Sequence, residues 1–306
     1  MSNAANPRTL LIVGGSGFLS GTLARTATAR GYQVWTITRG RQPLPAGAAN
    51  LRADRHDPAA FARAVAAAQT HWDLVVDCIG YEVADARQDI EVFRERTRHF
   101  VFVSTDFVFD PAHRRFPQGE ETAYYLQEGY GGNKRLCELE FINGDTGSMA
   151  WTILRPCHIY GPGSQLGCLP LHGRDPQLIA KLRSGQPLQL VGGGHFLQQP
   201  ILAADLAALI LRAGESPATR GQIFCTAGPE LIESRDYYRI IADILEVDLC
   251  IKELPVDQHL SAHPETATFL CHRIYDLSKL RTAGVELPAT PLAKGLRQHV
   301  ESLLPG

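Results

Sequence analysis

Two features that mark special classes of protein are missing from this 306-residue sequence, a long apolar run and an excess of charge. No stretch approaches the roughly 20 consecutive apolar residues that a membrane-spanning helix requires. The formal net charge is −2, whereas a dedicated nucleic-acid binder needs a basic surface to contact phosphates. Residues 1–7 are polar and lack the apolar core of a signal peptide. We therefore expect a cytoplasmic protein that binds neither membrane nor nucleic acid.

Cysteine and histidine are present without the spacings that bind metals. The seven cysteines are scattered, odd in number and never form a CxxC pair, and the eleven histidines include no HExxH motif. The chain is long enough for a sizeable core, and 44% of its residues are hydrophobic. We therefore expect reduced core cysteines, no disulfide framework and no metal site.

The strongest local signal is the segment RTLLIVGGSGFLSG, residues 8–21. Its apolar run LLIV is typical of a parallel strand that is buried on both faces. Gly14 and Gly17 follow directly, and the pattern predicts a helix over residues 17–30 with Ser16 as its N-cap. Glycines let the backbone approach an anion, and a helix N-terminus offers free N–H groups. The unit is therefore typical of diphosphate binding.

Segments with strand and helix patterns alternate along the chain after this turn. Strands are predicted over residues 33–38, 50–53, 74–79, 151–155 and 221–227, and a strand with a loop over 99–109. Helices are predicted over 58–68, 86–96, 176–184, 199–213 and 232–245. Such alternation predicts an α/β fold with a parallel sheet and helices on both of its faces.

The end of the second predicted strand lacks the carboxylate that commonly accepts hydrogen bonds from an adenosine ribose. Arg39 and Arg41 stand there instead, and guanidinium groups suit recognition of a 2′-phosphate. A solvated basic loop is the alternative, because Pro43 and Pro45 follow closely. We predict NADP as the cofactor, with NAD as the alternative.

Tyr130 and Lys134 are spaced to share one face of a helix. A tyrosine with its ordinary pKa of about 10 is a poor base at neutral pH. A lysine ammonium and the cationic ring of an oxidised nicotinamide cofactor both favour the tyrosinate, and Lys134 would also hold the nicotinamide ribose. Thr105 follows a central strand at the sheet edge where ligands bind, so its hydroxyl is predicted to bond a substrate oxygen.

Together these segments resemble the extended short-chain dehydrogenase/reductase family, which includes nucleotide-sugar epimerases, dehydratases and reductases. The matching motifs are a GxxGxxG turn with Ser20 at its third glycine, S-[ST]-x-x-V-[YF] from Ser104, YGxxKxxxE from Tyr130, RPxxxYGPG from Arg155 and YDxSKL from Tyr275. The resemblance runs from about residue 8 to about residue 295, which is most of the chain.

The resemblance implies a Rossmann doubly wound parallel sheet and a smaller C-terminal substrate lobe. The dinucleotide-binding domain is expected over residues 7–160, with 195–227 returning to it. The substrate lobe is expected over 161–194 and 228–306. The expected partner is a small-molecule substrate, and a homodimer is left open.

A set of site residues also follows from the resemblance. The catalytic residues are Thr105, Tyr130 and Lys134. The cofactor-binding residues are Gly14, Gly17, Phe18, Leu19, Arg39, Arg41, Asp54, Arg55, Ile79, Gly80, Tyr130, Lys134 and Pro156, and the substrate-binding residues are Asp106, His158 and Gln198.

Phe107 and Gln198 bear on the type of reaction. Phe107 stands where dehydratases of the family carry a glutamate, and it cannot exchange a proton. Residues 104–110 instead resemble the STDYVFD segment of dTDP-4-dehydrorhamnose reductases. Glutamines around position 198 replace an arginine that sugar-nucleotide members use to hold a diphosphate, which disfavours a nucleotide sugar.

The sequence therefore predicts an NAD(P)-dependent reductase or epimerase, rather than a dehydratase. The substrate is expected to be sugar-like or another small carbonyl or alcohol compound. The alternative is a non-catalytic, dinucleotide-binding regulatory or RNA-associated protein of the same fold.

Overall fold

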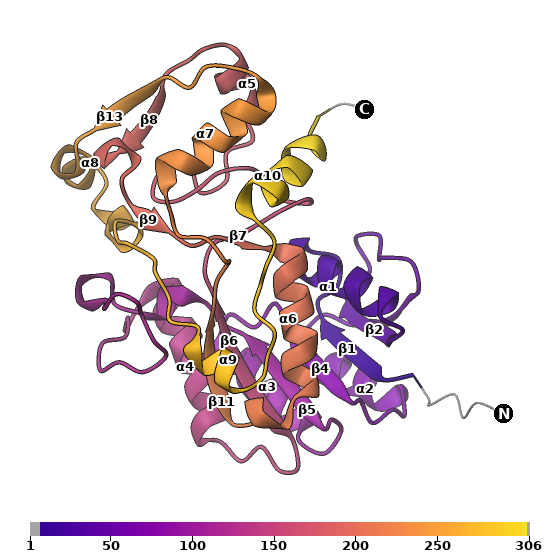
Figure 1. The fold of residues 1–306 in the computed structure, drawn as a ribbon. Helices are drawn as coiled ribbons and strands as arrows, with labels where there is room; N and C mark the ends of the chain where they lie inside the picture. The colour runs from indigo at the N-terminus through magenta and orange to yellow at the C-terminus, as the bar shows by residue number, and fades with distance from the viewer. Residues whose placement is uncertain (1–6, 305–306) are drawn as a thin grey trace.

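The computed structural model describes residues 7–304. Its centre is a seven-stranded sheet with the order β11-β6-β5-β4-β1-β2-β3, in which every neighbouring pair is parallel (Figure 1). The strands are β1 (Thr9–Val13), β2 (Gln33–Thr38), β3 (Ala48–Arg52), β4 (Leu74–Asp77), β5 (His99–Val103), β6 (Ala150–Pro156) and β11 (Gln222–Thr226). The parallel sheet of the alternating pattern and the Rossmann-like α/β fold implied by the resemblance are both confirmed.

Helices cover both faces of this sheet. α1 (Phe18–Ala29) and α6 (Ala203–Glu215) pack side by side on one face, and α2 (Pro58–Ala67), α3 (Val83–Phe93) and α4 (Gly129–Asn143) belong to the other (Figure 1). Successive strand side chains point to opposite faces, so each strand contributes to two cores. In β1, Leu10 and Ile12 lie in the core under α1 and α6, while Leu11 and Val13 lie in the other core.

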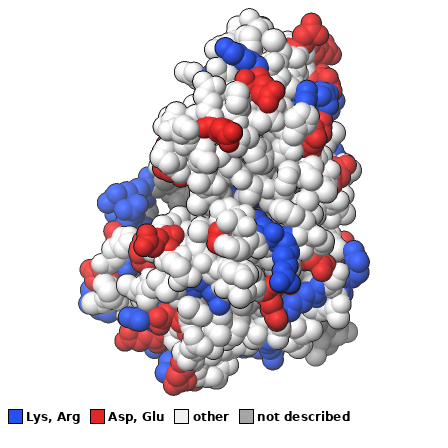
Figure 2. Space-filling view, turned by 90° about the vertical axis from the view of Figure 1, so that its left-hand side faces the viewer, with Lys and Arg blue, Asp and Glu red and all other residues white. Residues whose placement is uncertain are grey.

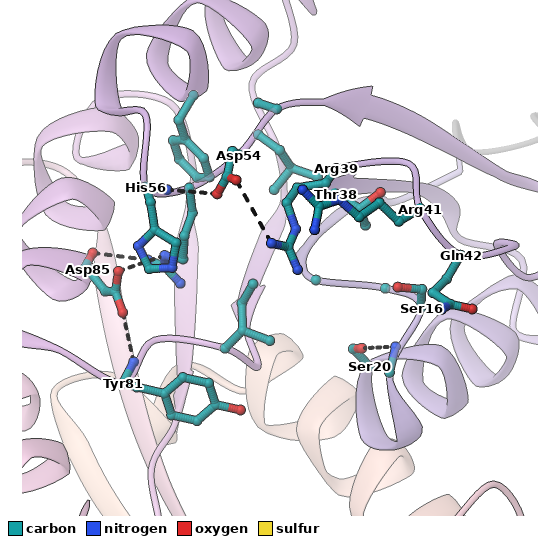
Figure 3. Close-up of a pocket in the computed structure, with 18 of the residues that line it drawn as sticks. Ser16, Ser20, Thr38, Arg39, Arg41, Gln42, Asp54, His56, Tyr81 and Asp85 are labelled. Carbon is teal, nitrogen blue, oxygen red and sulfur yellow. Dashed lines mark hydrogen bonds and ion pairs between the residues drawn. The ribbon is translucent and has the colours of Figure 1, made fainter.

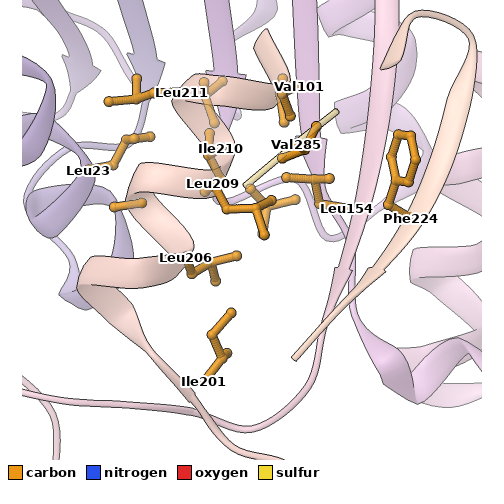
Figure 4. Close-up of a cluster of buried hydrophobic side chains, with 14 of the residues drawn as sticks. Leu23, Val101, Leu154, Ile201, Leu206, Leu209, Ile210, Leu211, Phe224 and Val285 are labelled. Atoms are coloured by element: carbon orange, nitrogen blue, oxygen red, sulfur yellow. The ribbon is translucent and has the colours of Figure 1, made fainter. Parts of the chain in front are cut away.

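The core beneath α6 explains why this late helix belongs to the sheet. Leu206, Leu209 and Ile210 are fully buried, and they pack with Val101 of β5 and Leu154 of β6 (Figure 4). The chain therefore returns from the second lobe to complete the sheet layer.

A second lobe forms around its own buried cluster, which contains Tyr160, Leu178, Tyr237, Tyr238 and Leu296. Its helices are α5 (Leu178–Arg183), α7 (Ser234–Leu245), α8 (Val256–Ala262) and α10 (Leu292–Glu301). Its short strands are β7 (Ile159–Tyr160), β8 (Leu188–Val191), β9 (Leu197–Gln198), β10 (Ile201–Leu202), β12 (Ile232–Glu233) and β13 (Ile251–Leu254), paired as β7 with β10, β8 with β13 and β9 with β12.

Several short elements connect these layers. They are η1 (Asp106–Val108), η2 (Pro111–His113), η3 (Gly192–Gly194), η4 (Pro217–Thr219), η5 (Pro264–Phe269) and the helix α9 (Ser278–Thr282). Leu280 of α9 and Val285 lie in the core between α6 and the sheet. The chain around α9 therefore packs against the sheet layer, although the resemblance implies that it belongs to the substrate lobe.

Some local expectations need correction. The N-cap of α1 is Gly17 and not Ser16, because the Ser20 hydroxyl oxygen accepts the Gly17 N–H at 3.1 Å. The expected helix over residues 199–213 begins at Ala203, because residues 201–202 form β10. Residues 99–109 form a strand followed by a loop, as expected, with β5 ending at Val103 before the chain turns toward η1.

Five of the seven cysteines are buried, as expected for core residues, whereas Cys250 is exposed. Acidic and basic side chains are interspersed on the face shown in Figure 2. No helix within residues 7–304 is both long and apolar enough to cross a membrane. The expectation drawn from the N-terminal segment falls on residues 1–6, which lie outside the described residues.

Candidate active site

The glycine turn lies at the carboxyl end of β1, where the sheet order reverses between β1 and β4. Ligands of open α/β sheets bind at this switch point. Gly14 has a φ of 107°, which disfavours any side chain, and a Cβ on Gly15 would lie 2.4 Å from Thr36 Cγ2. The turn therefore needs glycine both for its conformation and for its close approach to β2.

A cavity of about 500 Å³ opens beside this turn and is called here the glycine-turn pocket. Its lining includes Gly14, Gly17, Thr38, Arg39, Arg41, Asp54 and Tyr81. Arg39 lies 4.0 Å from the Asp54 carboxylate, whereas Arg41 stands beyond it at the pocket edge (Figure 3). The arginine pair therefore faces the pocket, and Asp54 partly balances its charge.

Arg55 is held by carboxylates on the wall of the same pocket. Its guanidinium lies 2.9 Å from Asp77, 3.0 Å from Asp85 and 3.1 Å from Asp89. Burial opposes the charge on Asp77, but Arg55 holds the pKa of that carboxyl below its ordinary value. Burial raises the pKa of Asp89 well above its ordinary value. This cluster braces β4, α3 and the loop at Gly80, so Arg55 has little capacity left for a ligand.

A second cavity of about 390 Å³ contains the Tyr130 and Lys134 side chains and is called here the tyrosine pocket. It shares Gly17, Ser20, Ile79 and Tyr81 with the glycine-turn pocket, so the two form one elongated cleft. The remaining lining includes Phe18, Leu19, Thr105, Asp106, Phe107, Pro156, His158, Leu169 and Arg174.

Thr105, Tyr130 and Lys134 meet in the tyrosine pocket. Lys134 is buried and donates to the carbonyl oxygens of Gly80 and Val103, both at 2.7 Å. An ammonium group has three donors, so one N–H remains for a ligand. Burial raises the pKa of the half-exposed Tyr130, and the Thr105 hydroxyl offsets part of the rise. The site therefore holds a neutral phenol beside a lysine at neutral pH.

Gly131 allows the helix that carries Tyr130 to pack tightly. A Cβ at this position would lie 2.0 Å from the Phe107 carbonyl oxygen, so α4 can approach the loop after β5 only with glycine here. The Phe107 and Tyr130 rings then meet edge to face, with centroids 6.1 Å apart. This contact fixes the phenol beside Thr105.

Buried hydrogen bonds of Glu138 hold the same helix, α4, against the sheet. Its carboxylate accepts a hydrogen bond from Ser104 Oγ at 2.6 Å and two from Arg155 at 2.9 and 2.7 Å. Burial opposes its charge, but Arg155 holds the pKa of Glu138 below its ordinary value. The network joins α4 to the ends of β5 and β6 just beneath Thr105.

Asp106 lines the tyrosine pocket, and other protein groups already bind its carboxylate. Its carboxylate pairs with Arg273 and with Arg114, and it accepts a hydrogen bond from the Tyr275 hydroxyl. Burial disfavours its charge, but the two arginines outweigh this and hold its pKa below the ordinary value. Asp106 is therefore a fixed anion with two cations around it, which leaves the cluster with a net positive charge.

Most residues predicted for the site line this cleft. They are Gly14, Gly17, Phe18, Leu19, Arg39, Arg41, Asp54, Arg55, Ile79, Thr105, Asp106, Tyr130, Lys134, Pro156 and His158. Gly80 contributes the carbonyl that binds Lys134. Gln198 is not brought together with them, because it is fully buried in β9 and lines neither pocket.

Tyr81, Leu169 and Arg174 line the cleft although the sequence analysis did not single them out. Tyr81 follows the predicted fourth strand closely, so its place at the strand end gave a usable signal. Leu169 and Arg174 lie in a loop of the second lobe that carries no motif. Their position depends on how this lobe packs over the sheet.

The cleft has the features needed to hold a dinucleotide. The glycine turn and the start of α1 provide a close backbone approach for a diphosphate, and Arg39 and Arg41 flank one end. Lys134 and Tyr130 stand at the other end, next to Thr105. The residues present therefore fit an extended cofactor with its reactive end in the tyrosine pocket.

Comparison with known proteins agrees with this description. The family model described as the NAD dependent epimerase/dehydratase family matches residues 10–225. The 2-alkyl-3-oxoalkanoate reductase of Stenotrophomonas maltophilia is 26% identical over 340 aligned residues, which cover 94% of this chain and 97% of that protein. The chloroplast stem-loop binding protein of 41 kDa b of Arabidopsis thaliana is 26% identical, over 75% of this chain and 61% of that protein.

Among solved structures, UDP-glucose 4-epimerase with UDP-glucose from Thermotoga maritima has the same fold. The TM-score is 0.76 at 18% sequence identity, and the match covers 96% of this chain and 98% of that one. The glycine turn, the seven-stranded parallel sheet and the family match all agree. The chain belongs to the NAD dependent epimerase/dehydratase family, within the extended short-chain dehydrogenases/reductases.

Proposed function

We propose that this protein is an NADPH-dependent reductase of small carbonyl compounds. The observation that carries the proposal is the meeting of Thr105, Tyr130 and Lys134 in one cleft with the glycine turn. A member that kept the dinucleotide only as a structural ligand would have no need for a phenol, a hydroxyl and an ammonium group in one pocket.

The protein's own groups supply binding, orientation and a proton. When bound, the nicotinamide cofactor supplies the hydride. Tyr130 then donates its phenolic proton to the substrate oxygen, and its raised pKa keeps that proton in place at neutral pH. The Thr105 hydroxyl would bond the same oxygen, and the third N–H of Lys134 would hold the nicotinamide ribose.

Residues at the adenosine end favour NADPH over NADH in this proposal. Arg39 and Arg41 face the glycine-turn pocket, and in the described part of the chain Arg39 pairs there with the Asp54 carboxylate alone, at 4.0 Å. A 2′-phosphate brings two negative charges that can pair with both guanidinium groups. The NAD of the family description remains the alternative.

In the tyrosine pocket, the groups available for proton exchange favour reduction of the substrate over loss of water. A dehydratase needs groups beside the substrate that exchange protons, but Phe107 has none and Asp106 is bound by two arginines. His158 lines the same pocket, and burial lowers its pKa to about 4, so it is neutral at pH 7 and suited to bond a polar substrate. The similarity to a reductase over nearly the full chain supports the same reaction.

Cofactor stoichiometry tests the proposal. The protein is incubated with NADPH and a panel of 3-oxo esters, ketones and keto sugars, and NADPH loss is compared with the alcohol formed. We expect one NADPH consumed per alcohol. Product without net NADPH loss would show an epimerase, or a dehydratase if the product has lost the mass of water. NADPH binding without turnover of any compound would support the non-catalytic alternative.

A further inference from the structure

The tyrosine pocket is lined by a cation that no group within residues 7–304 neutralises. Three of its lining residues are charged, namely Asp106, Lys134 and Arg174. Asp106 is bound by two arginines, and Lys134 donates to two carbonyls. Within residues 7–304, Arg174 forms no ion pair or hydrogen bond through its side chain, and its guanidinium rests 5.8 Å from the centre of the Phe18 ring.

The acid next to Arg174 in the chain is already paired with other groups of its loop. Asp175 accepts hydrogen bonds from Lys181 Nζ at 2.6 Å and from the Gln177 N–H at 2.8 Å, and His172 lies 3.5 Å away. The Asp175 N–H donates to the Leu166 carbonyl at 2.8 Å. These bonds fix the loop while leaving the Arg174 guanidinium in the pocket.

Tight backbone packing holds the same loop in place. Gly167 has a φ of 146°, and a Cβ there would lie 1.8 Å from the His172 carbonyl oxygen and 3.1 Å from the Arg174 backbone nitrogen. His172 Nε2 lies 2.8 Å from the Gln189 carbonyl oxygen, which ties the loop to β8. Arg174 therefore projects from a braced segment, which reduces the entropy lost when it binds a partner.

The electrostatic effect of Arg174 reaches the reacting groups. Burial is the main cause of the lowered pKa of His158, and the Arg174 charge acts in the same direction. The same charge opposes the rise in the pKa of Tyr130. The Asp106 cluster beneath Phe107 carries two arginines against one carboxylate, so its net charge adds to the positive potential of the pocket, although neither arginine lines it.

The geometry points to Arg174 as the residue that selects an anionic substrate, a carbonyl compound that carries a carboxylate. This inference rests on the proposed function and names the substrate class for the same site. A planar guanidinium with a free edge matches a carboxylate through two parallel N–H···O bonds. The Arg174 guanidinium would hold the carboxylate of the substrate, while the carbonyl oxygen of the substrate accepts hydrogen bonds from Tyr130 and Thr105.

The diphosphate of the cofactor is the competing anion for Arg174. The Arg174 guanidinium rests on the Phe18 ring, and Phe18 begins α1 beside the glycine turn. Arg174 lines the tyrosine pocket and not the glycine-turn pocket, which favours the substrate. The two sources give different results when the cofactor and the substrate analogue are titrated separately.

A binding experiment tests the inference without requiring turnover. The NADPH-loaded protein is titrated with 3-hydroxyhexanoate and with its neutral primary amide, using calorimetry. We expect the acid to bind about 10- to 100-fold more tightly than the amide, as for a hydrogen-bonded charge pair. Arg174→Gln should remove this preference, whereas Arg174→Lys should keep part of it.

Arg183→Gln is the matched control, because Arg183 is exposed on α5 in the same lobe and lines neither pocket. It should leave both affinities unchanged. Equal binding of acid and amide by the unaltered protein would overturn the inference, as would a loss in Arg174→Gln confined to NADPH affinity. If acid preference depends on Arg174 but no carbonyl compound is reduced, the inference stands and the proposed function fails.

Discussion

Lys134 Nζ donates to the carbonyl oxygen of Gly80 at 2.7 Å. The bond joins α4, which carries Tyr130, to the loop that follows β4. A second bond of the same length to Val103 ties the ammonium to the end of β5. Lys134 thus spans the ends of two central strands, and it organises the pocket before any ligand arrives.

Tyr130→Phe should remove the proposed proton donor while keeping the ring contacts with Phe107 and Tyr81. We expect turnover to fall by about 10²- to 10⁴-fold, the usual contribution of a general acid. NADPH affinity, measured by fluorescence titration, should stay close to normal. Tyr124→Phe is the control, because Tyr124 is exposed and stacks on His113 outside the cleft. Full activity of Tyr130→Phe would show that another group supplies the proton.

Arg41→Gln should weaken NADPH binding far more than NADH binding, since only NADPH has a 2′-phosphate for the guanidinium to bond. We expect a loss of about 10- to 100-fold for NADPH, in line with a charge-assisted hydrogen bond. The two dissociation constants, measured by titration of the same preparation, give the comparison. An equal loss for both cofactors would contradict an NADPH-selective role.

The sequence predicted the sheet and the reactive groups at the carboxyl ends of its central strands because those signals are local. β2 has the bounds expected from its apolar pattern, and α2 begins at Pro58 as expected, where Asp57 caps it by accepting the Ala60 N–H at 2.9 Å. The glycine turn and the Tyr130 and Lys134 pair are also short motifs, and both line the cleft. Each depends on neighbours within a few residues.

The rest of the site could not be predicted because it depends on contacts between distant segments. Arg273 pairs with Asp106 from 167 positions away, so no local pattern shows that this carboxylate is already bound. Gly131 matters because of the Phe107 carbonyl on another segment. Arg174 reaches the pocket only because the second lobe folds over the sheet.

Glu138→Gln should destabilise the fold, since it leaves the buried Arg155 guanidinium without its carboxylate. Breaking a buried ion pair costs about 3–5 kcal/mol of the free energy of unfolding. Glu140→Gln on the same helix is the matched control, because its partner Arg87 is exposed and the expected loss is much smaller. Urea denaturation of both variants makes the comparison. Equal losses would show that the Glu138 network contributes little.

His99 should make stability depend on pH in the acid range. Its ring is buried, with Nδ1 donating to the Gly214 carbonyl oxygen at 3.0 Å and Nε2 lying 2.8 Å from the Thr152 hydroxyl. Burial lowers its pKa to about 4, against about 6.5 in the unfolded chain. Between these values the unfolded state binds the extra proton, so stability falls as the pH falls from about 6.5 to 4.

The size of this effect can be measured by urea denaturation at pH 7.5 and pH 5.0. Between pH 7.5 and pH 5.0, we expect the free energy of unfolding to fall by about 2 kcal/mol less in His99→Gln than in the unaltered protein. Other buried histidines keep their contribution in both proteins, so the difference isolates His99. A drop of the same size in both proteins would mean that His99 does not carry this pH dependence.

The order in which the sheet is completed has a consequence for folding. β6 ends at Pro156, but its outer neighbour β11 begins only at Gln222, after α5 and β7 to β10 of the second lobe and the helix α6 have been made. Until then β6 is an edge strand with free N–H and C=O groups, and until α6 is made at Ala203–Glu215 the core on that face of the sheet is uncovered as well. Such an edge can pair with another chain. Fragments that end before residue 222 should therefore aggregate, and protein synthesis passes through this exposed state each time the chain is made.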